Sequence, residues 1–372
     1  MQSLEYSLIY TVELTKPQMY KIADYIHNGA LLARNILFPD SKKLAQLMIY
    51  ATNRCQSRCR HCSIWQKPHE VLSKDEIVKM MSSRCISRHT TVGLEGGEFV
   101  LHPQADEIME WFQKNHPNYT LLSNGLHSQK VIELSNCYRP KHLYLSLDGN
   151  RDTYSYMRGV DGHDKVIAVV EELKDRIPTS LMFCLSPFNS FKDMEYTIDI
   201  ARHYDIDIRI GIYGTMAYFD TKAEMLNTQR AEYLTQIPKN IHNTQENYDF
   251  VAFYDQWRSG NLRLRCHSIA GSLVVHPDGN VPLCQNLDVM LGNIKEKSLD
   301  HIFNSSESVA TQCRYSKECN GCWINFHRKY DIIFLRNLEK VLPKKIIDYF
   351  YGRYQWCADS HMTYRDYFKS IK

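Results

Sequence analysis

The sequence predicts an α/β fold in which a parallel sheet and its crossover helices form a partial (β/α)6 barrel. Two observations lead to this fold class: short apolar, β-rich runs recur between residues 45 and 214, and helix-like segments separate them. Strands that alternate with helices of about 10–15 residues form right-handed βαβ units and a parallel sheet. The six units found here are too few for the usual eight-stranded closed barrel, so a partial barrel or a curved open sheet is expected.

The individual elements follow from apolar runs and helix caps. The expected strands are 45–52, 91–95, 119–123, 142–147, 180–186 and 207–213. The expected helices between them are 73–84, 103–114, 128–136, 164–176 and 190–203. The first helix begins at Ser73, which has Glu76 three residues later, the spacing of a capping box.

Changes in pattern divide the chain into several regions. We expect a helical extension (1–44), the barrel (45–215), a helical connection (216–262), a small second domain (263–326) and a helical tail (327–372). Within the second domain, two short strands at 272–276 and 281–284 are expected to pair as a hairpin across Pro277-Asp278-Gly279.

Composition excludes several classes of protein. Hydrophobic residues make up 44% and charged residues 23% of the 372 residues, which is ordinary for a globular chain. A net charge of +3 is small for a nucleic-acid binder, so no nucleic-acid partner is expected. No apolar run approaches the roughly 20 residues of a membrane span. The N-terminus has no basic segment typical of a signal peptide, and a cytoplasmic location is therefore expected.

The cysteines are the most informative residues. In a chain without a secretory signal, the twelve cysteines should be reduced, and clustered spacing then indicates metal or redox chemistry. Cys55, Cys59 and Cys62 form a CxxxCxxC run after the first expected strand. These three thiols could hold zinc with His61 or His69 as a fourth ligand, hold an iron–sulfur cubane with one open iron, or be unrelated.

Further motifs stand where the next strands meet their loops, at the edge where α/β folds bind ligands. They are Gly96-Gly97-Glu98-Phe99, Ser123-Asn124-Gly125, Ser146-Leu147-Asp148-Gly149 and Arg158-Gly159. Together with the CxxxCxxC run, they resemble the radical S-adenosylmethionine (SAM) superfamily over residues 45–215. Phe99 stands in place of the proline of that family's GGEP motif.

This resemblance implies a cofactor and a reaction type. Cys55, Cys59 and Cys62 would ligate a [4Fe–4S] cluster whose open iron binds SAM through its amino and carboxylate groups. Reduction by a flavodoxin- or ferredoxin-type electron donor would cleave SAM to methionine and a 5′-deoxyadenosyl radical, which abstracts a hydrogen atom from the substrate. The protein would supply orientation and exclusion of water.

The resemblance also assigns the residues around SAM. They are His61 near the adenine; Gly96, Gly97 and Glu98 at the methionine amine; Ser146 and Arg158 at the carboxylate; and, elsewhere in the site, Ser123, Asn124, Asp148 and Tyr213. An ordinary loop ion pair is the alternative for Arg158 and Asp148. Core packing is the alternative for Tyr213.

A second cysteine group lies in the C-terminal part of the chain. Cys266, Cys284, Cys319 and Cys322, with Gly279 in a GxxxxC element, resemble the SPASM or twitch extension of radical SAM enzymes. Two fully ligated clusters would need eight cysteines, but six follow residue 260, so one auxiliary [4Fe–4S] cluster is expected. A zinc site made by the same four residues is the alternative, and Cys313 is an alternative ligand.

The main functional hypothesis is a radical SAM enzyme acting on a small polar substrate, such as a sugar or an aminocyclitol, by dehydrogenation or epimerisation. The alternative is modification of a ribosomally made peptide by epimerisation, thioether formation or cross-linking. The 44-residue N-terminal extension argues mildly against that alternative because it is too short for a winged-helix peptide-binding domain. A remote third hypothesis is a non-catalytic zinc- or iron–sulfur-stabilised binding protein.

Two features outside the ligand sets carry weaker hypotheses. Cys184, expected mid-strand, and Cys357 in the tail are candidate hydrogen-atom donors for an epimerase, although Cys184 also suits a buried, inert thiol. The basic and apolar segment 328–353 is compatible with weak contact to a membrane surface. Its plainer interpretation is a pair of amphipathic helices closing the barrel mouth.

Overall fold

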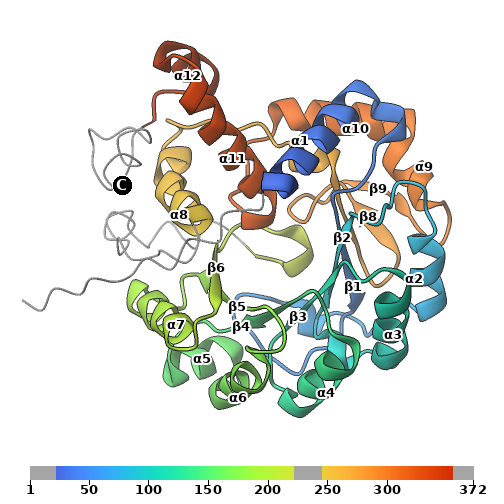
Figure 1. Cartoon of the computed structure of the whole chain (residues 1–372), viewed down its shortest axis with the longest axis vertical. Coiled ribbons are helices and arrows are strands. Elements are labelled where there is room, and N and C mark those ends of the chain that lie inside the picture. The colour runs from blue at the N-terminus through green and yellow to red at the C-terminus, as the bar shows by residue number, and fades with distance from the viewer. Residues whose placement is uncertain (1–21, 222–244, 355–372) are drawn as a thin grey trace, which may run out of the picture.

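A computed structural model describes residues 22–221 and 245–354, and its centre is a curled parallel sheet (Figure 1). The seven strands are β1 (Gln46–Thr52), β2 (Thr91–Gly96), β3 (Tyr119–Ser123), β4 (His142–Ser146), β5 (Thr179–Leu185), β6 (Asp207–Ile212) and β7 (Ser272–Val275). Their order in the sheet is β6-β5-β4-β3-β2-β1-β7, and every neighbouring pair is parallel. The predicted α/β class and partial barrel are confirmed.

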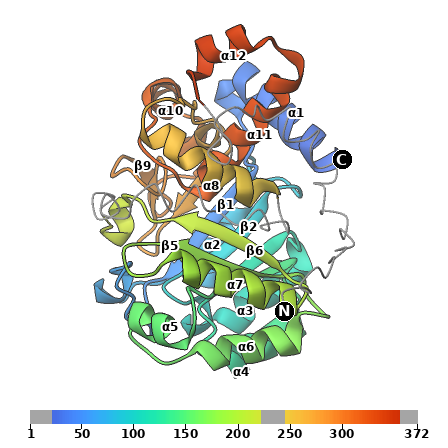
Figure 2. The same cartoon turned by 90° about the vertical axis from the view of Figure 1, so that its left-hand side faces the viewer.

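Helices cover the outer face of this sheet (Figures 1 and 2). They are α2 (Lys74–Met81), α3 (Ala105–Asn115), α4 (Ser128–Tyr138), α5 (Arg151–Arg158), α6 (His163–Leu173) and α7 (Phe191–His203). The capping box expected at Ser73 and Glu76 is present at the start of α2. Alternate strand residues such as Leu47, Leu121 and Leu181 are fully buried in the core on this face.

The other residues of each strand form what we call the inner face, which is turned away from these helices because side chains alternate along a strand. Its members at the carboxyl-end level include Tyr50 on β1, Glu95 on β2, Ser146 on β4 and Cys184 on β5. The inner face is more polar and more exposed than the outer one. It is therefore the face available to a ligand.

The turn expected across Pro277-Asp278-Gly279 is present, because the His276 N–H donates to the Asn280 carbonyl at 2.9 Å. The expected pairing of 272–276 with 281–284 beyond this turn is wrong, since the two segments belong to different sheets. Residues 272–275 instead form β7, which pairs parallel with β1 from Gln46 opposite Ser272 onward. The turn after β7 does reverse the chain, since the Gly279 N–H donates to the His276 carbonyl at 2.9 Å. However, β8 (Asn280–Pro282) pairs antiparallel with β9 (Met290–Asn293). The open edge of β1 offers backbone groups that need partners, and β7 satisfies them.

The remaining helices lie at the opposite end of the molecule from α4–α6 (Figures 1 and 2). They are α1 (Ile22–Leu37), α8 (Gln245–Arg258), α9 (Leu299–Asn304), α10 (Ser306–Glu318), α11 (Asn325–Val341) and α12 (Lys344–Tyr351). Short 3-10 turns are η1 (Pro39–Ser41), η2 (Ile64–Gln66), η3 (Phe99–Leu101), η4 (Ala217–Phe219) and η7 (Ser268–Ala270). None of the helices described is both long and apolar enough to cross a bilayer.

The C-terminal helices combine a packed and an exposed side. α11 packs against α8 and β6, while Tyr349 and Phe350 of α12 are 83% and 63% exposed. The contact with a membrane surface considered for this segment stays a prediction.

Candidate active site

The first three cysteines lie in the loop that follows β1, and this loop is held against the end of α5. Cys59 is buried, whereas Cys55 and Cys62 are half-buried. The N–H groups of Arg58 and Arg60 donate to carbonyls at the end of α5, each at 2.8 Å. These bonds fix the loop at the carboxyl edge of the sheet.

The glycine pair at the end of β2 allows the cysteine loop to approach that strand. The Gly97 N–H donates to the Thr52 carbonyl at 2.7 Å, and the Glu98 N–H donates to the Arg54 carbonyl at 2.7 Å. A Cβ at Gly96 would lie 2.4 Å from the Thr52 carbonyl oxygen, and one at Gly97 would lie 2.4 Å from that of Arg54. Glycine is required by this backbone contact, a role that sequence reasoning missed because it depends on a neighbouring strand.

Glu98 connects the ends of β2 and β3. Its carboxylate accepts hydrogen bonds from the Ser123 hydroxyl at 2.9 Å and from the Asn124 N–H at 2.8 Å. Burial raises the pKa of Glu98 to about 7, although these bonds oppose the shift. The side-chain nitrogen Nδ2 of Asn124 lies 3.7 Å from Cys55 Sγ. Glu98, Ser123 and Asn124, all expected at the SAM site, are thus brought together beside the cysteine loop.

Arg158 and Asp148 form a buried ion pair next to the same loop. Arg158 Nε lies 2.7 Å from Asp148 Oδ2, and Nη2 lies 2.5 Å from it. Arg158 Nη1 lies 3.7 Å from Cys59 Sγ. The structure therefore contains the loop ion pair considered for these residues, and it places a positive charge beside one thiol. Direct contact of Arg158 with a carboxylate of SAM stays a prediction.

The remaining residues expected around SAM differ in their surroundings. His61 is half-buried, and its Nδ1 atom is buried without a hydrogen-bond partner among the residues described. Burial, reinforced by Arg158, lowers the pKa of His61 to about 4. Ser146 ends β4 on the inner face, half-buried. Tyr213 belongs to the hydrophobic core and contacts Phe188 edge to face, so core packing describes its position.

Of the two hydrogen-donor candidates, Cys184 lies among the residues that the structure describes. Cys184 lies on the inner face, and its N–H donates to Asp148 Oδ1 at 3.0 Å. Burial raises the pKa of its thiol to about 12, so this side chain carries a proton at neutral pH. Cys357 lies outside the described residues.

The donor set of the first site fits a metal cluster. Burial raises the pKa of Cys55 and Cys62 to about 12, and both are therefore neutral thiols in the protein alone. Metal coordination would deprotonate them, with Arg158 nearby to balance part of the charge. The unsatisfied His61 Nδ1 is the kind of buried atom that a bound ligand can satisfy.

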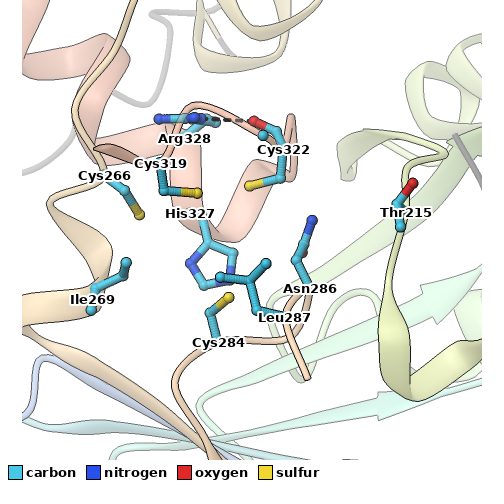
Figure 3. A pocket seen from close by; sticks show the side chains of 11 residues that line it. Thr215, Cys266, Ile269, Cys284, Asn286, Leu287, Cys319, Cys322, His327 and Arg328 are labelled. Carbon is cyan, nitrogen blue, oxygen red and sulfur yellow. Dashed lines mark hydrogen bonds between the residues drawn. The ribbon is translucent and has the colours of Figure 1, made fainter. Parts of the chain in front are cut away.

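The second cysteine group surrounds one pocket. Figure 3 shows the side chains of Cys266, Cys284, Cys319 and Cys322 directed toward one another. Cys284 follows β8, and Cys319 caps the end of α10. Segments far apart in the sequence thus contribute the four thiols, which have the chemistry of an iron–sulfur or zinc site. By contrast, Cys313 is exposed on α10 and does not line the pocket.

Arg328 provides a fixed positive charge at this pocket. It is fully buried and pairs with Asp331 at 3.0 Å. Its Nε donates to the Cys322 carbonyl at 2.9 Å, which places the guanidinium beside the thiol pair. Burial raises the pKa of Cys322 to about 12, and the guanidinium opposes this shift, so Arg328 would help to balance the charge of thiolates held by a metal. Across the part of the chain that is described, no three His, Cys, Asp or Glu side chains converge closely enough to hold a single metal ion.

Comparisons with known proteins identify a domain around each cysteine group. The radical SAM superfamily model matches residues 49–201, and the SPASM iron–sulfur cluster-binding domain model matches residues 266–323. The subtilosin biosynthesis protein AlbA of Bacillus subtilis, a protein of antilisterial bacteriocin biosynthesis, is 25% identical over 326 residues. That alignment covers 78% of this chain and 71% of AlbA.

Solved structures show the same fold. SuiB of Streptococcus suis bound to its precursor peptide SuiA has a TM-score of 0.56 and 13% identity, covering 78% of this chain and 72% of SuiB. The protein anSMEcpe with bound SAM has a TM-score of 0.51 and 16% identity, covering 82% of this chain and 99% of anSMEcpe. At these identities the similarity concerns the fold alone.

Proposed function

The chain belongs to the radical SAM superfamily and carries a SPASM iron–sulfur domain, and from this premise we propose that it modifies a ribosomally synthesised peptide. The observation that carries the proposal is the similarity to AlbA, which extends over 326 residues and is not confined to one domain. AlbA serves the biosynthesis of a bacteriocin, a peptide product. Sequence reasoning favoured a sugar or aminocyclitol substrate, and this similarity instead favours its peptide alternative.

The first site would start the reaction. When bound, a reduced [4Fe–4S] cluster and SAM supply a 5′-deoxyadenosyl radical that can abstract a hydrogen atom from the substrate. Cys55, Cys59 and Cys62 would hold this cluster. Gly96 and Gly97 keep the cysteine loop against β2, and the pairing of Arg158 with Asp148 holds a positive charge beside Cys59.

The remaining SAM contacts are proposed from the same arrangement. Glu98, Ser123 and Asn124 form one hydrogen-bonded group next to Cys55, and His61 presents an unsatisfied nitrogen. Ser146 lies at the same carboxyl edge of the sheet. The substrate would then lie on the inner face, where a radical formed at this edge can reach it.

The auxiliary site would take part in electron transfer or substrate binding. We assign one cluster to Cys266, Cys284, Cys319 and Cys322, since these four thiols line a single pocket and Cys313 does not. Cys266 and Cys284 flank β7, the strand that pairs with β1. The segment between Cys266 and Cys284 therefore joins the main sheet beside β1, the strand that leads to the first cysteine loop, which favours a shared role of the two groups in one reaction.

A reconstituted enzyme and short peptides encoded beside its gene provide the test. Each peptide is incubated anaerobically with protein, SAM and dithionite in deuterated water, and the products are examined by mass spectrometry. Loss of two hydrogen atoms would indicate a thioether or cross-link, and incorporation of one solvent deuterium at carbon would indicate epimerisation. Cys55→Ala should abolish both. Oxidation of a sugar or aminocyclitol, with every peptide unchanged, would contradict the proposal.

A further inference from the structure

The strands of the main sheet contain very few charged side chains. Across β1–β7 these are Glu95, Asp207 and Arg209. Arg209 Nε lies 3.0 Å from Asp207 Oδ2, so two of the three charges form an ion pair. Glu95 makes no hydrogen bond or ion pair with any of the residues described. A carboxylate is thus left on the inner face without a counter-charge.

Glu95 occupies a position built to hold its side chain. It stands opposite Tyr50 in the pairing of β1 with β2 and directly precedes Gly96 and Gly97, which contact the cysteine loop. A Cβ at Gly93 would lie 2.9 Å from Glu95 Oε1. The carboxylate therefore lies over Gly93, where the missing side chain leaves room for it.

Aromatic hydroxyls lie within electrostatic reach of Glu95. After burial itself, Glu95 is the largest contributor that raises the pKa of Tyr50, and it also adds to the raised pKa of Tyr144. Both tyrosines belong to the inner face, on β1 and β4. The Tyr50 ring is buried between other rings, whereas Tyr144 is half-buried, so an organic cation held near Glu95 would gain a cation–π attraction from Tyr144.

An isolated carboxylate at this position is costly to the fold. Burial raises the pKa of Glu95 to about 8, and no cation opposes the shift. Burying a charge without a partner is unfavourable unless the group is neutralised or acquires a partner. At neutral pH the side chain therefore holds its proton, and a bound cation would stabilise the ionised form and release that proton.

We propose that Glu95 binds a positively charged group of the substrate on the inner face of the sheet. For a peptide substrate this group is a lysine ammonium, an arginine guanidinium or the amino terminus, an assignment that rests on the proposed function. Glu95 is then a specificity-determining residue, placed at the strand end that adjoins the cysteine loop. It selects which part of the substrate is presented to the radical.

The first test uses small probes, so that it does not depend on the peptide. Binding of n-butylammonium and n-butylguanidinium to the reconstituted holoenzyme with SAM is measured by calorimetry, with 1-pentanol as the neutral probe. We expect Glu95→Gln to weaken binding of the cations by about tenfold or more and to leave 1-pentanol unchanged. Iron content and SAM binding report that the variant is folded. The control Glu133→Gln changes an exposed glutamate on α4 and should bind like the wild type.

Equal affinities of wild type and Glu95→Gln for the cations would overturn the proposal. So would a wild-type protein that binds the cations no better than 1-pentanol. If Glu95 instead served as a general base, the wild type would bind the cations no better than 1-pentanol, and Glu95→Gln would still have a lower turnover.

The second test identifies the cationic group once a modified peptide is in hand. Peptides are compared in which the lysine or arginine nearest the modified residue is replaced by glutamine, or in which the amino terminus is acetylated. One change should raise KM by about tenfold for the wild type and have little effect for Glu95→Gln. If neither change alters KM, the proposal is refuted. If the small cations bind through Glu95 but no peptide is modified, the peptide function fails and the cation site stands.

Discussion

Replacing Glu95 by glutamine should make the protein more stable to alkaline pH. The pKa of Glu95 is about 8 in the folded chain, against an ordinary value of 4.5. Between these values the folded chain holds a proton on Glu95 that the unfolded chain has lost. Stability therefore falls as pH rises through this window, and the loss is complete above the folded pKa.

The size of the effect follows from the same values. Each pH unit within the window costs about 1.4 kcal/mol. When the pH is raised from about 6 to about 9, only the part below the folded pKa of about 8 lies within the window, so the cost is about 2.7 kcal/mol. Because the side chain is half-buried and keeps some solvent contact, we expect about 2 kcal/mol. Glu95→Gln has no such proton to lose. Any constant cost of the buried amide is the same at both pH values and cancels.

Urea unfolding of the anaerobically reconstituted protein, followed by circular dichroism, measures the difference. The free energy of unfolding is determined at both pH values for the wild type, Glu95→Gln and the control Glu133→Gln. Histidine and cysteine titrations are common to all three proteins and cancel. If Glu95→Gln loses as much stability as the wild type over this range, Glu95 is not an unpaired buried carboxylate, and the reasoning fails.

Three further predictions concern the cysteine sites. The reconstituted protein should contain about eight iron atoms, and changing Cys55, Cys59 and Cys62 together to alanine should leave about four and abolish SAM cleavage. Cys137→Ala, at an exposed cysteine, is the control, and zinc at both sites would contradict the assignment. Cys319→Ala should remove the auxiliary cluster while SAM still binds, and Cys313→Ala should keep all the iron. Loss of iron in Cys313→Ala, with all the iron kept in Cys319→Ala, would exclude our ligand set. Gly97→Ala should destabilise the protein by about 2 kcal/mol in urea unfolding and loosen the first cluster, because its Cβ would lie 2.4 Å from the Arg54 carbonyl oxygen. The control Gly214→Ala, at a glycine with open space around it, should change neither stability nor cluster binding. Equal stability of the two variants would count against the contact.

Local patterns in the sequence were sufficient for much of the fold. The six strands β1–β6 were predicted because each is a short apolar run that needs no distant partner to be identified. The start of α2 was predicted because a capping box joins residues three apart, here Ser73 and Glu76. The pairing of β7 could not be predicted this way. Its neighbour β1 lies more than two hundred residues earlier, and the turn after β7 is equally compatible with a hairpin.

For the candidate sites, too, local sequence determined some features and the tertiary structure decided the others. The sequence by itself determined the cysteine spacing and the motifs at the strand ends, since both are properties of residues close together in the chain. Only the tertiary structure decided that four distant cysteines line one pocket and that Cys313 lies outside it. It also decided that Glu95 faces the inner side of the sheet without a counter-charge, because pairing of charges depends on which strands become neighbours.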